Sequence, residues 1–275
     1  MFRATKFEVL GPVRGWAGET ELELGSPQQR AVLAMLLLAR GRQVPLDVLI
    51  DGLWETDAPR SAAGTVRTYV SRLRGLLGTG DASYADCGIT SAGGGYALRL
   101  GSATLDLDEF ELLLRDARSA WHREETARAV GLFRCALGLW RGAALAGVPG
   151  SYAESRRVKL TELQLAAEEE RLAIEIAAGE HAIAIAELRA LLAEHPFREG
   201  LSESLMLALY KAGRQADAFT VYNTVRRGLR DELGVDPGPA LQEMYHRILR
   251  ADDRLLELDE QEECVIAWAS DHRGW

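Results

Sequence analysis

Proline, cysteine and aromatic residues are scarce in this 275-residue sequence, with 8 prolines, 3 cysteines and 7% aromatic residues. Cys87, Cys135 and Cys264 are odd in number and far apart, unlike a disulfide framework or a paired metal motif. The apolar run between Arg30 and Arg40 is much shorter than the about 20 residues that a membrane-spanning helix needs. Hydrophobic residues nevertheless make up 47% of the chain, enough for a core. We therefore expect a globular protein of the cytoplasm that does not associate with membranes.

Motifs for catalysis and cofactor binding are also missing. The five histidines have no metal-ligand spacing, and the triplet Gly93–Gly95 is not followed by the Lys-Ser/Thr of a phosphate loop. Acidic pairs such as Asp252-Asp253 are typical of solvated helix faces. We therefore expect no enzymatic activity, no cofactor and no metal.

Charge is distributed unevenly along the chain. Residues 1–100 have a net charge of +1, whereas residues 101–275 have a net charge of −10. The overall acidity argues against a protein that binds nucleic acid over its whole surface, but local patches decide such contacts. One stretch of the first hundred residues, Arg60–Leu77, has four arginines and no acidic residue.

The first hundred residues predict short strands and three helices. Alternating residues predict strands at Lys6–Leu10 and Glu19–Leu24. Ser26 followed by Pro27 is an N-cap signal for a helix to about Ala39, which is apolar on most of its surface and so central to the core. A second, short helix is predicted over Asp47–Trp54.

The third helix, Ser61–Leu77, has an apolar stripe on one side and small polar residues on the other. Its stripe is Val66, Tyr69, Val70, Leu73, Leu76 and Leu77, and the opposite face has Gly64, Thr68, Ser71 and Gly75. Arginines flank that polar face, which suits a helix in the major groove because arginine donates two hydrogen bonds to guanine. We predict base contacts from Arg67, Thr68 and Arg72. The alternative is a merely solvated face.

A glycine-rich hairpin follows the third helix. Ile89–Ser91 and Tyr96–Leu100 read as strands, joined by Ala92 and the glycines Gly93, Gly94 and Gly95. Strands, three helices and a hairpin in this order match winged-helix DNA-binding domains of the response-regulator type. Glycines allow the tip of the wing to approach phosphates, so we expect Gly93, Gly94 and Gly95 to contact the DNA backbone. A turn that only connects two strands is the alternative.

From Leu105 onward the sequence predicts helices with an internal repeat. Gly179, Ala184 and Leu188 recur as Gly213, Ala218 and Tyr222 after a shift of 34 residues. This is the period of tetratricopeptide repeats, whose arrays bind proteins on a concave surface. The repeats could instead only buttress the DNA-binding domain. The predicted fold is therefore mainly α: an N-terminal winged helix-turn-helix followed by an all-α tetratricopeptide-like domain.

Two clusters of motifs resemble the SARP family, the antibiotic regulatory proteins of actinobacteria. The first comprises Gly25–Leu33, Asp47–Trp54 and Thr65–Arg74. The second, Leu207–Ala218 and Glu232–Leu241, resembles the bacterial transcriptional activation domain of that family.

The resemblance implies an activator of transcription. It implies three parts: a DNA-binding domain over 1–104, an activation domain over 105–251, and a tail over 252–275, which we expect to be disordered. The implied partners are double-stranded DNA with direct repeats near the −35 element of an antibiotic gene cluster, RNA polymerase with its sigma subunit, and a second protomer arranged head to tail. The winged-helix pattern adds phosphate contacts from Thr65, Tyr69, Ser71 and Arg74. The alternative is a helical-repeat interaction or sensor protein that takes a small-molecule or protein effector and binds DNA weakly.

Overall fold

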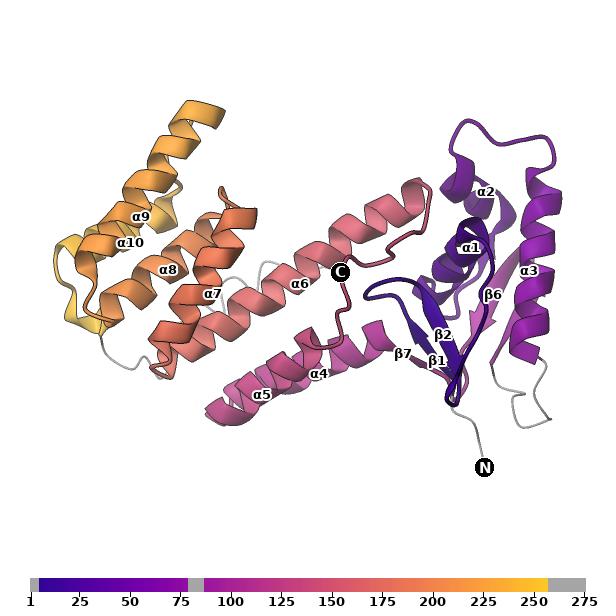
Figure 1. The fold of residues 1–275 in the computed structure, drawn as a ribbon, viewed down its shortest axis with the longest axis horizontal. Coiled ribbons are helices and arrows are strands. Elements are labelled where there is room, and N and C mark those ends of the chain that lie inside the picture. Colours follow the sequence, from indigo (N-terminus) through magenta and orange to yellow (C-terminus); the bar gives the residue numbers. More distant parts are fainter. Residues whose placement is uncertain (1–4, 79–86, 257–275) are drawn as a thin grey trace. The chain divides into compact units, whose positions relative to one another are not determined.

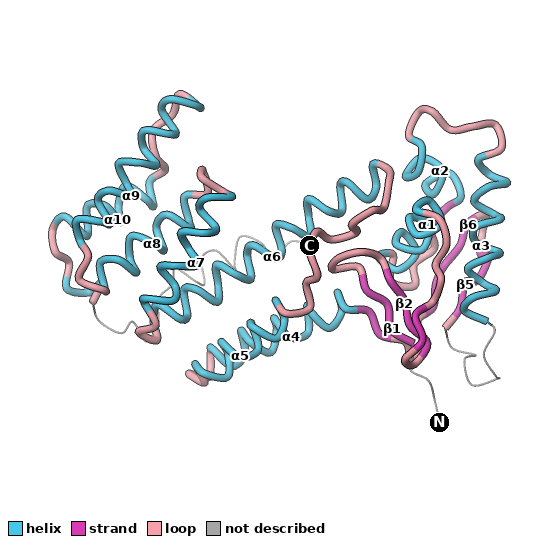
Figure 2. The backbone as a smooth tube through the Cα atoms, in the orientation of Figure 1, coloured by secondary structure: helices cyan, strands magenta, loops and turns pink. Residues whose placement is uncertain are grey.

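The computed structural model describes residues 5–78 and 87–256. Within these ranges the strands belong to the N-terminal part of the chain, and the rest is helical (Figure 1, Figure 2). The packing divides the chain into two compact units. The first holds the residues up to Arg118 together with Leu132–Leu165, and the second holds Ser119–Gly131 and the residues from Ala166 on. The fold class predicted from the sequence is confirmed.

The elements follow the order expected for a winged helix and then a helical array. The N-terminal elements are β1 (Thr5–Glu8), β2 (Arg14–Ala17), β3 (Thr20–Glu21), α1 (Pro27–Leu38), β4 (Val44–Pro45), α2 (Leu46–Trp54), α3 (Ala62–Gly78), β5 (Gly88–Ala92) and β6 (Gly95–Arg99). They are followed by β7 (Thr104–Leu105), α4 (Asp106–Trp121), α5 (Thr126–Leu137), α6 (Ser151–Ala177), α7 (His181–Glu194), α8 (Glu199–Lys211), α9 (Gln215–Gly228), the π-helical turn η2 (Leu229–Leu233), α10 (Pro239–Leu249) and the 3-10 turn η3 (Asp253–Leu255).

Two small sheets flank the helices of the first unit. One has the order β3-β2-β1-β7, with β7 parallel to β1, and the other has the order β4-β6-β5. The strand predicted at Glu19–Leu24 is shorter than expected, and β2 was missed because Gly15 interrupts its alternation. This glycine lies opposite Phe7, where an added Cβ would be 3.2 Å from the ring.

Helix α1 is the centre of the first core, as the sequence predicted. Every residue from Ala31 to Leu37 is at most 3% exposed, and α1 packs against α2 and α3. The predicted cap is present, because the Ser26 hydroxyl accepts a hydrogen bond from the Gln29 amide at 3.3 Å. Proline at the first helical position leaves no amide without a partner there.

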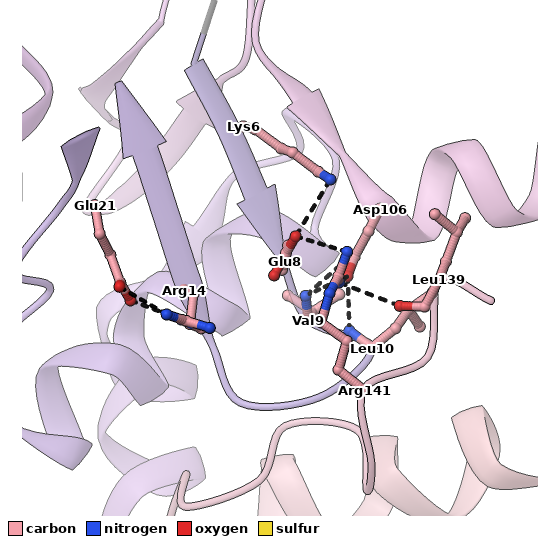
Figure 3. Close-up of polar contacts among 9 residues, drawn as sticks. All are labelled: Lys6, Glu8, Val9, Leu10, Arg14, Glu21, Asp106, Leu139 and Arg141. Carbon is pink, nitrogen blue, oxygen red and sulfur yellow. Dashed lines mark hydrogen bonds and ion pairs between the residues drawn. The ribbon is translucent and has the colours of Figure 1, made fainter. Parts of the chain in front are cut away.

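A buried carboxylate joins the start of α4 to the end of β1 (Figure 3). Asp106 has no exposed surface, and its two oxygens accept hydrogen bonds from the amides of Val9 at 2.9 Å and Leu10 at 3.1 Å. Arg141 lies beside this carboxylate: its Nη1 is 3.6 Å from Asp106 Oδ2, and its Nη2 is 2.8 Å from Glu8 Oε1. Burial raises the pKa of Asp106 to about 6, despite the backbone amides of Val9, Leu10 and Leu107, which favour its charged form.

The connection between α5 and α6 also belongs to the first unit. The Arg141 amide donates to the Leu10 carbonyl at 2.8 Å, and the Leu145 amide donates to the Val9 carbonyl at 3.0 Å. Leu145 is fully buried although its φ of 55° is left-handed, a conformation that costs a non-glycine residue energy. Gly150 lies so close to α2 that an added Cβ would be 2.2 Å from the Gly52 carbonyl oxygen. This connection therefore completes the core under the winged helix.

The second unit shows the predicted 34-residue repeat as equivalent turns between helices. Gly179 ends α6 and Gly213 ends α8, both with left-handed φ, at 88° and 73°. The small Ala184 and Ala218, each completely buried, occupy equivalent places in α7 and α9. Helix α8 packs against α7, α9 and α10. Of the predicted tail, residues 253–255 form η3, and residues 257–275 lie outside the described part of the chain.

Candidate nucleic-acid interface

Helix α3 has one buried face and one exposed face, as its spacing predicted. Val66, Val70 and Leu73 are at most 1% exposed and pack toward α1 and α2. On the other side the small and hydroxylated residues and two arginines are exposed: Gly64, Arg67, Thr68, Ser71, Arg72 and Gly75. All three predicted base-contact residues, Arg67, Thr68 and Arg72, therefore share one solvent-facing surface.

The two threonines of α3 hydrogen-bond to their own helix. Thr68 Oγ1 donates to the Gly64 carbonyl at 3.0 Å, and Thr65 Oγ1 donates to the Ser61 carbonyl at 3.1 Å. A hydroxyl that donates its proton keeps two acceptor lone pairs. Thr68 consequently offers a methyl group and an acceptor at the exposed face, whereas Thr65 is half-buried.

Tyr69 and Arg74, two predicted phosphate contacts, hold α3 in place. The Tyr69 hydroxyl donates to Gln28 Oε1 of α1 at 2.8 Å. Arg74 reaches the wing, where its Nε donates to the Ile89 carbonyl at 2.9 Å and its Nη2 donates to Ser91 Oγ at 2.7 Å. The Arg74 guanidinium also lies 5.6 Å from the centre of the Tyr96 ring, within cation–π range. Arg74 thus fixes the wing beside the exposed face of α3.

The three glycines of the wing turn have different surroundings. Gly93 and Gly94 have left-handed φ values of 47° and 85°, and an added Cβ at Gly94 would meet no atom within 4 Å. Gly95 is buried under β4, and a Cβ there would be 2.3 Å from the Val44 carbonyl oxygen. Gly94 is therefore the open tip of the wing, and Gly95 allows the close approach of two strands.

Sequence reasoning missed the third strand of the wing and the partners of Arg74. Val44-Pro45 forms the edge strand β4, paired with β6. A strand of two residues is too short to show alternation, and its proline argues against a strand. Proline is tolerated in β4 because this strand lies at the edge of its sheet. The partners of Arg74 lie 15 and 17 residues away in the sequence, beyond the reach of helical spacing.

Comparison with known proteins agrees with this arrangement. The family model "Transcriptional regulatory protein, C terminal" matches residues 19–98, and "Bacterial transcriptional activator domain" matches residues 105–249. The regulatory protein DnrI of Streptomyces peucetius is 35% identical over 252 residues, which cover 90% of this chain and 93% of DnrI. The chain belongs to the SARP family. It carries the winged-helix and activator domains of this family of transcriptional regulators.

Other SARP relatives are longer. The regulatory protein AfsR of Streptomyces coelicolor is 50% identical over 256 residues, which cover 93% of this chain but only 25% of AfsR. The chain therefore spans a quarter of the length of that relative. Among solved structures, Mycobacterium tuberculosis EmbR in complex with a low affinity phosphopeptide matches with a TM-score of 0.87 and 36% identity, covering 97% of this chain and 69% of that chain. No helix in the described ranges is long and apolar enough to cross a membrane.

Proposed function

We propose that this SARP protein activates transcription of a secondary-metabolite gene cluster by binding direct repeats near the −35 element and recruiting RNA polymerase in the cytoplasm. The exposed face of α3, with Arg67 and Arg72 at its edges and a wing held beside it, is the observation that carries the proposal. A helix of this kind fits the major groove, where arginine recognises guanine. Direct repeats require two protomers that face the same way, so their contact would be heterologous.

The proposed contacts fall into two groups. Arg67, Thr68 and Arg72 are proposed to contact bases because their side chains are exposed on one face. Thr65, Ser71 and the exposed wing glycines Gly93 and Gly94 are proposed phosphate contacts, together with Tyr69 and Arg74. Gly95, also expected from the sequence to contact phosphate, is buried against β4 and instead supports the turn. The hydrogen bonds of Tyr69 and Arg74 within the protein give these two residues a second task, which is to orient α3 and the wing.

DNA binding is tested by titrating a labelled promoter fragment with two direct repeats and a scrambled fragment. Arg72→Ala is expected to weaken binding to the repeats by about 1–3 kcal/mol with little effect on the scrambled fragment. Arg189→Ala, an exposed arginine on α7 of the second unit, is the matched control and should bind as the native protein does. Equal loss on both fragments with Arg72→Ala would contradict base recognition by this residue. Absence of binding to the repeats would favour the alternative interaction or sensor protein.

Activation is tested separately by transcription with purified RNA polymerase. Residues 101–275 have a net charge of −10, which suits basic surfaces on the sigma subunit and keeps the helical domain away from DNA phosphates. A chain ending at Leu165 should bind the repeats but fail to activate at matched DNA occupancy. Equal activation by the shortened chain would show that the residues from Ala166 on do not recruit polymerase. An inverted footprint would contradict the head-to-tail arrangement.

A further inference from the structure

The second unit has an open groove of about 320 Å³ between α9, η2 and α10. Two tyrosines and His246 line it: Tyr222 of α9 and Tyr245 of α10 are stacked, with ring centres 4.3 Å apart and an interplanar angle of 24°. Phe219 contacts Tyr245 edge-on, at 5.3 Å between ring centres. Aromatic residues held by their neighbours present a rigid apolar surface at a low entropic cost.

Two arginines and one carboxylate lie in the same groove. Arg230 Nε donates to Asp236 Oδ1 at 2.7 Å, and Arg226 Nε is 4.0 Å from the same oxygen. The hydrogen bond to Arg230 lowers the pKa of Asp236, so this carboxyl is ionised near neutral pH. A single carboxylate thus faces two guanidinium groups, and the groove keeps an excess of positive charge within a domain that is acidic as a whole.

The arginines of the groove are accessible, whereas Tyr222 is only 8% exposed. The arginine side chains of Arg226 and Arg230 are 44% and 52% exposed, and ion pairs this exposed stabilise a fold very little. Two large apolar residues, Leu233 and Val235, are about half exposed in the turn that leads to Asp236. Tyrosine and arginine are enriched in protein interfaces, and large exposed apolar residues also mark sites of interaction.

The backbone around the groove is held in a fixed shape. The π-helical turn η2 ends at Gly234, which has a left-handed φ of 69°. Beyond it, Glu199 of α8 accepts a hydrogen bond from the Gly238 amide at 2.6 Å, and Gln242 Nε2 donates to the Pro237 carbonyl at 2.6 Å. Single π turns occur frequently at functional sites, and a preformed site binds without a large ordering cost.

We infer that this groove binds an acidic peptide segment of a partner protein, in which a carboxylate pairs with Arg226 and Arg230 and a neighbouring aromatic side chain packs against Tyr245. Charge complementarity favours this occupant, because a second carboxylate would pair the guanidinium group that Asp236 does not hydrogen-bond. Tyr245, which is partly exposed and stacked on the buried Tyr222, provides the apolar surface for the aromatic residue. The site lies in the second unit and does not depend on DNA as the ligand of α3.

The test uses the full chain and a fluorescein-labelled peptide, Asp-Glu-Asp-Trp-Glu-Asp-Glu, in a fluorescence anisotropy titration at low salt. The native protein should bind this probe, and the double variant Arg226→Gln/Arg230→Gln should bind at least about tenfold more weakly. Arg227→Gln is the matched control, because Arg227 is an exposed neighbour on α9 that does not line the groove. Its affinity should stay within about twofold of the native value.

Two further variants distinguish this groove from general attraction between charges. Asp236→Asn removes the internal competitor and should tighten binding severalfold, whereas Tyr245→Leu should weaken it. A probe with alanine in place of tryptophan should also bind more weakly. All variants should keep native affinity for promoter DNA, so a failure here is distinguishable from a failure of DNA binding.

Three outcomes would overturn the inference. The first is no binding of the probe by the native protein, and the second is an equal loss for Arg227→Gln and the double variant. The third concerns a different occupant: if sedimentation shows that the double variant dissociates an oligomer of the native chain, the groove is occupied by a second copy of this protein.

Discussion

Leu145 offers a sharp test of how the connection between α5 and α6 packs into the first unit. It lies within the match to the activator-domain model, yet its amide donates to the carbonyl of Val9, the residue that follows β1, and its side chain is fully buried in the first unit. Leu145→Ala should therefore destabilise the DNA-binding part of the protein. Buried leucine-to-alanine changes cost about 2–5 kcal/mol, and alanine retains the strained left-handed φ of 55°. Leu145→Gly loses the same packing contacts but relieves about 1 kcal/mol of that strain, so it should be less destabilising than Leu145→Ala by about this amount.

Hydrogen exchange followed by mass spectrometry is the appropriate assay, because two compact units need not unfold in one step. In Leu145→Ala, the free energy of opening at the amides of β1 and α1 should fall by roughly 2–5 kcal/mol, and these amides should exchange correspondingly faster. Leu188→Ala, a fully buried change in α7 of the second unit, is the control and should affect the helices from α7 to α9 without affecting β1. If Leu145→Ala leaves the protection of β1 and α1 unchanged, the connection between α5 and α6 is not part of the first core.

Three more predictions follow from the same contacts. Arg74→Ala should increase hydrogen exchange in β5 and weaken binding to repeat and scrambled DNA alike, and unchanged exchange in β5 would contradict its role as the link to the wing. Gly95→Ala should destabilise the wing, because its Cβ would clash with the Val44 carbonyl. Gly94→Ala meets no neighbouring atom, so it should lose only the stability that a left-handed φ costs alanine, and thermal unfolding of both variants measures the difference. Because the pKa of Asp106 is raised to about 6, its contribution to stability is fully present below its ordinary pKa of 3.8. This contribution, about 3 kcal/mol, should be lost as pH rises from 3.8 to about 6. Denaturation of the native protein and Asp106→Asn across this range measures the difference, and parallel curves would refute it.

Features that depend on neighbouring residues could be predicted from the sequence. The helical spacing of Val66, Val70 and Leu73 identified the buried face of α3 and therefore the exposed face with Arg67 and Arg72. The 34-residue shift identified equivalent turns in the second unit. Such patterns arise because a helix repeats every 3.6 residues, whatever it packs against.

Other features depend on which distant segments meet. The sequence contains Asp106 and Arg141, but only the tertiary structure brings Asp106 to amides 96 and 97 residues earlier and places Arg141 beside it. In the same way, Arg74 is one more arginine on a helix until folding brings the wing to it. The spacing of apolar residues along one helix shows which face is buried, because local helix geometry alone decides which residues share a face. The partners of an arginine or a buried carboxylate are decided by chain topology, because the free energy of placing a charge depends on every group that surrounds it.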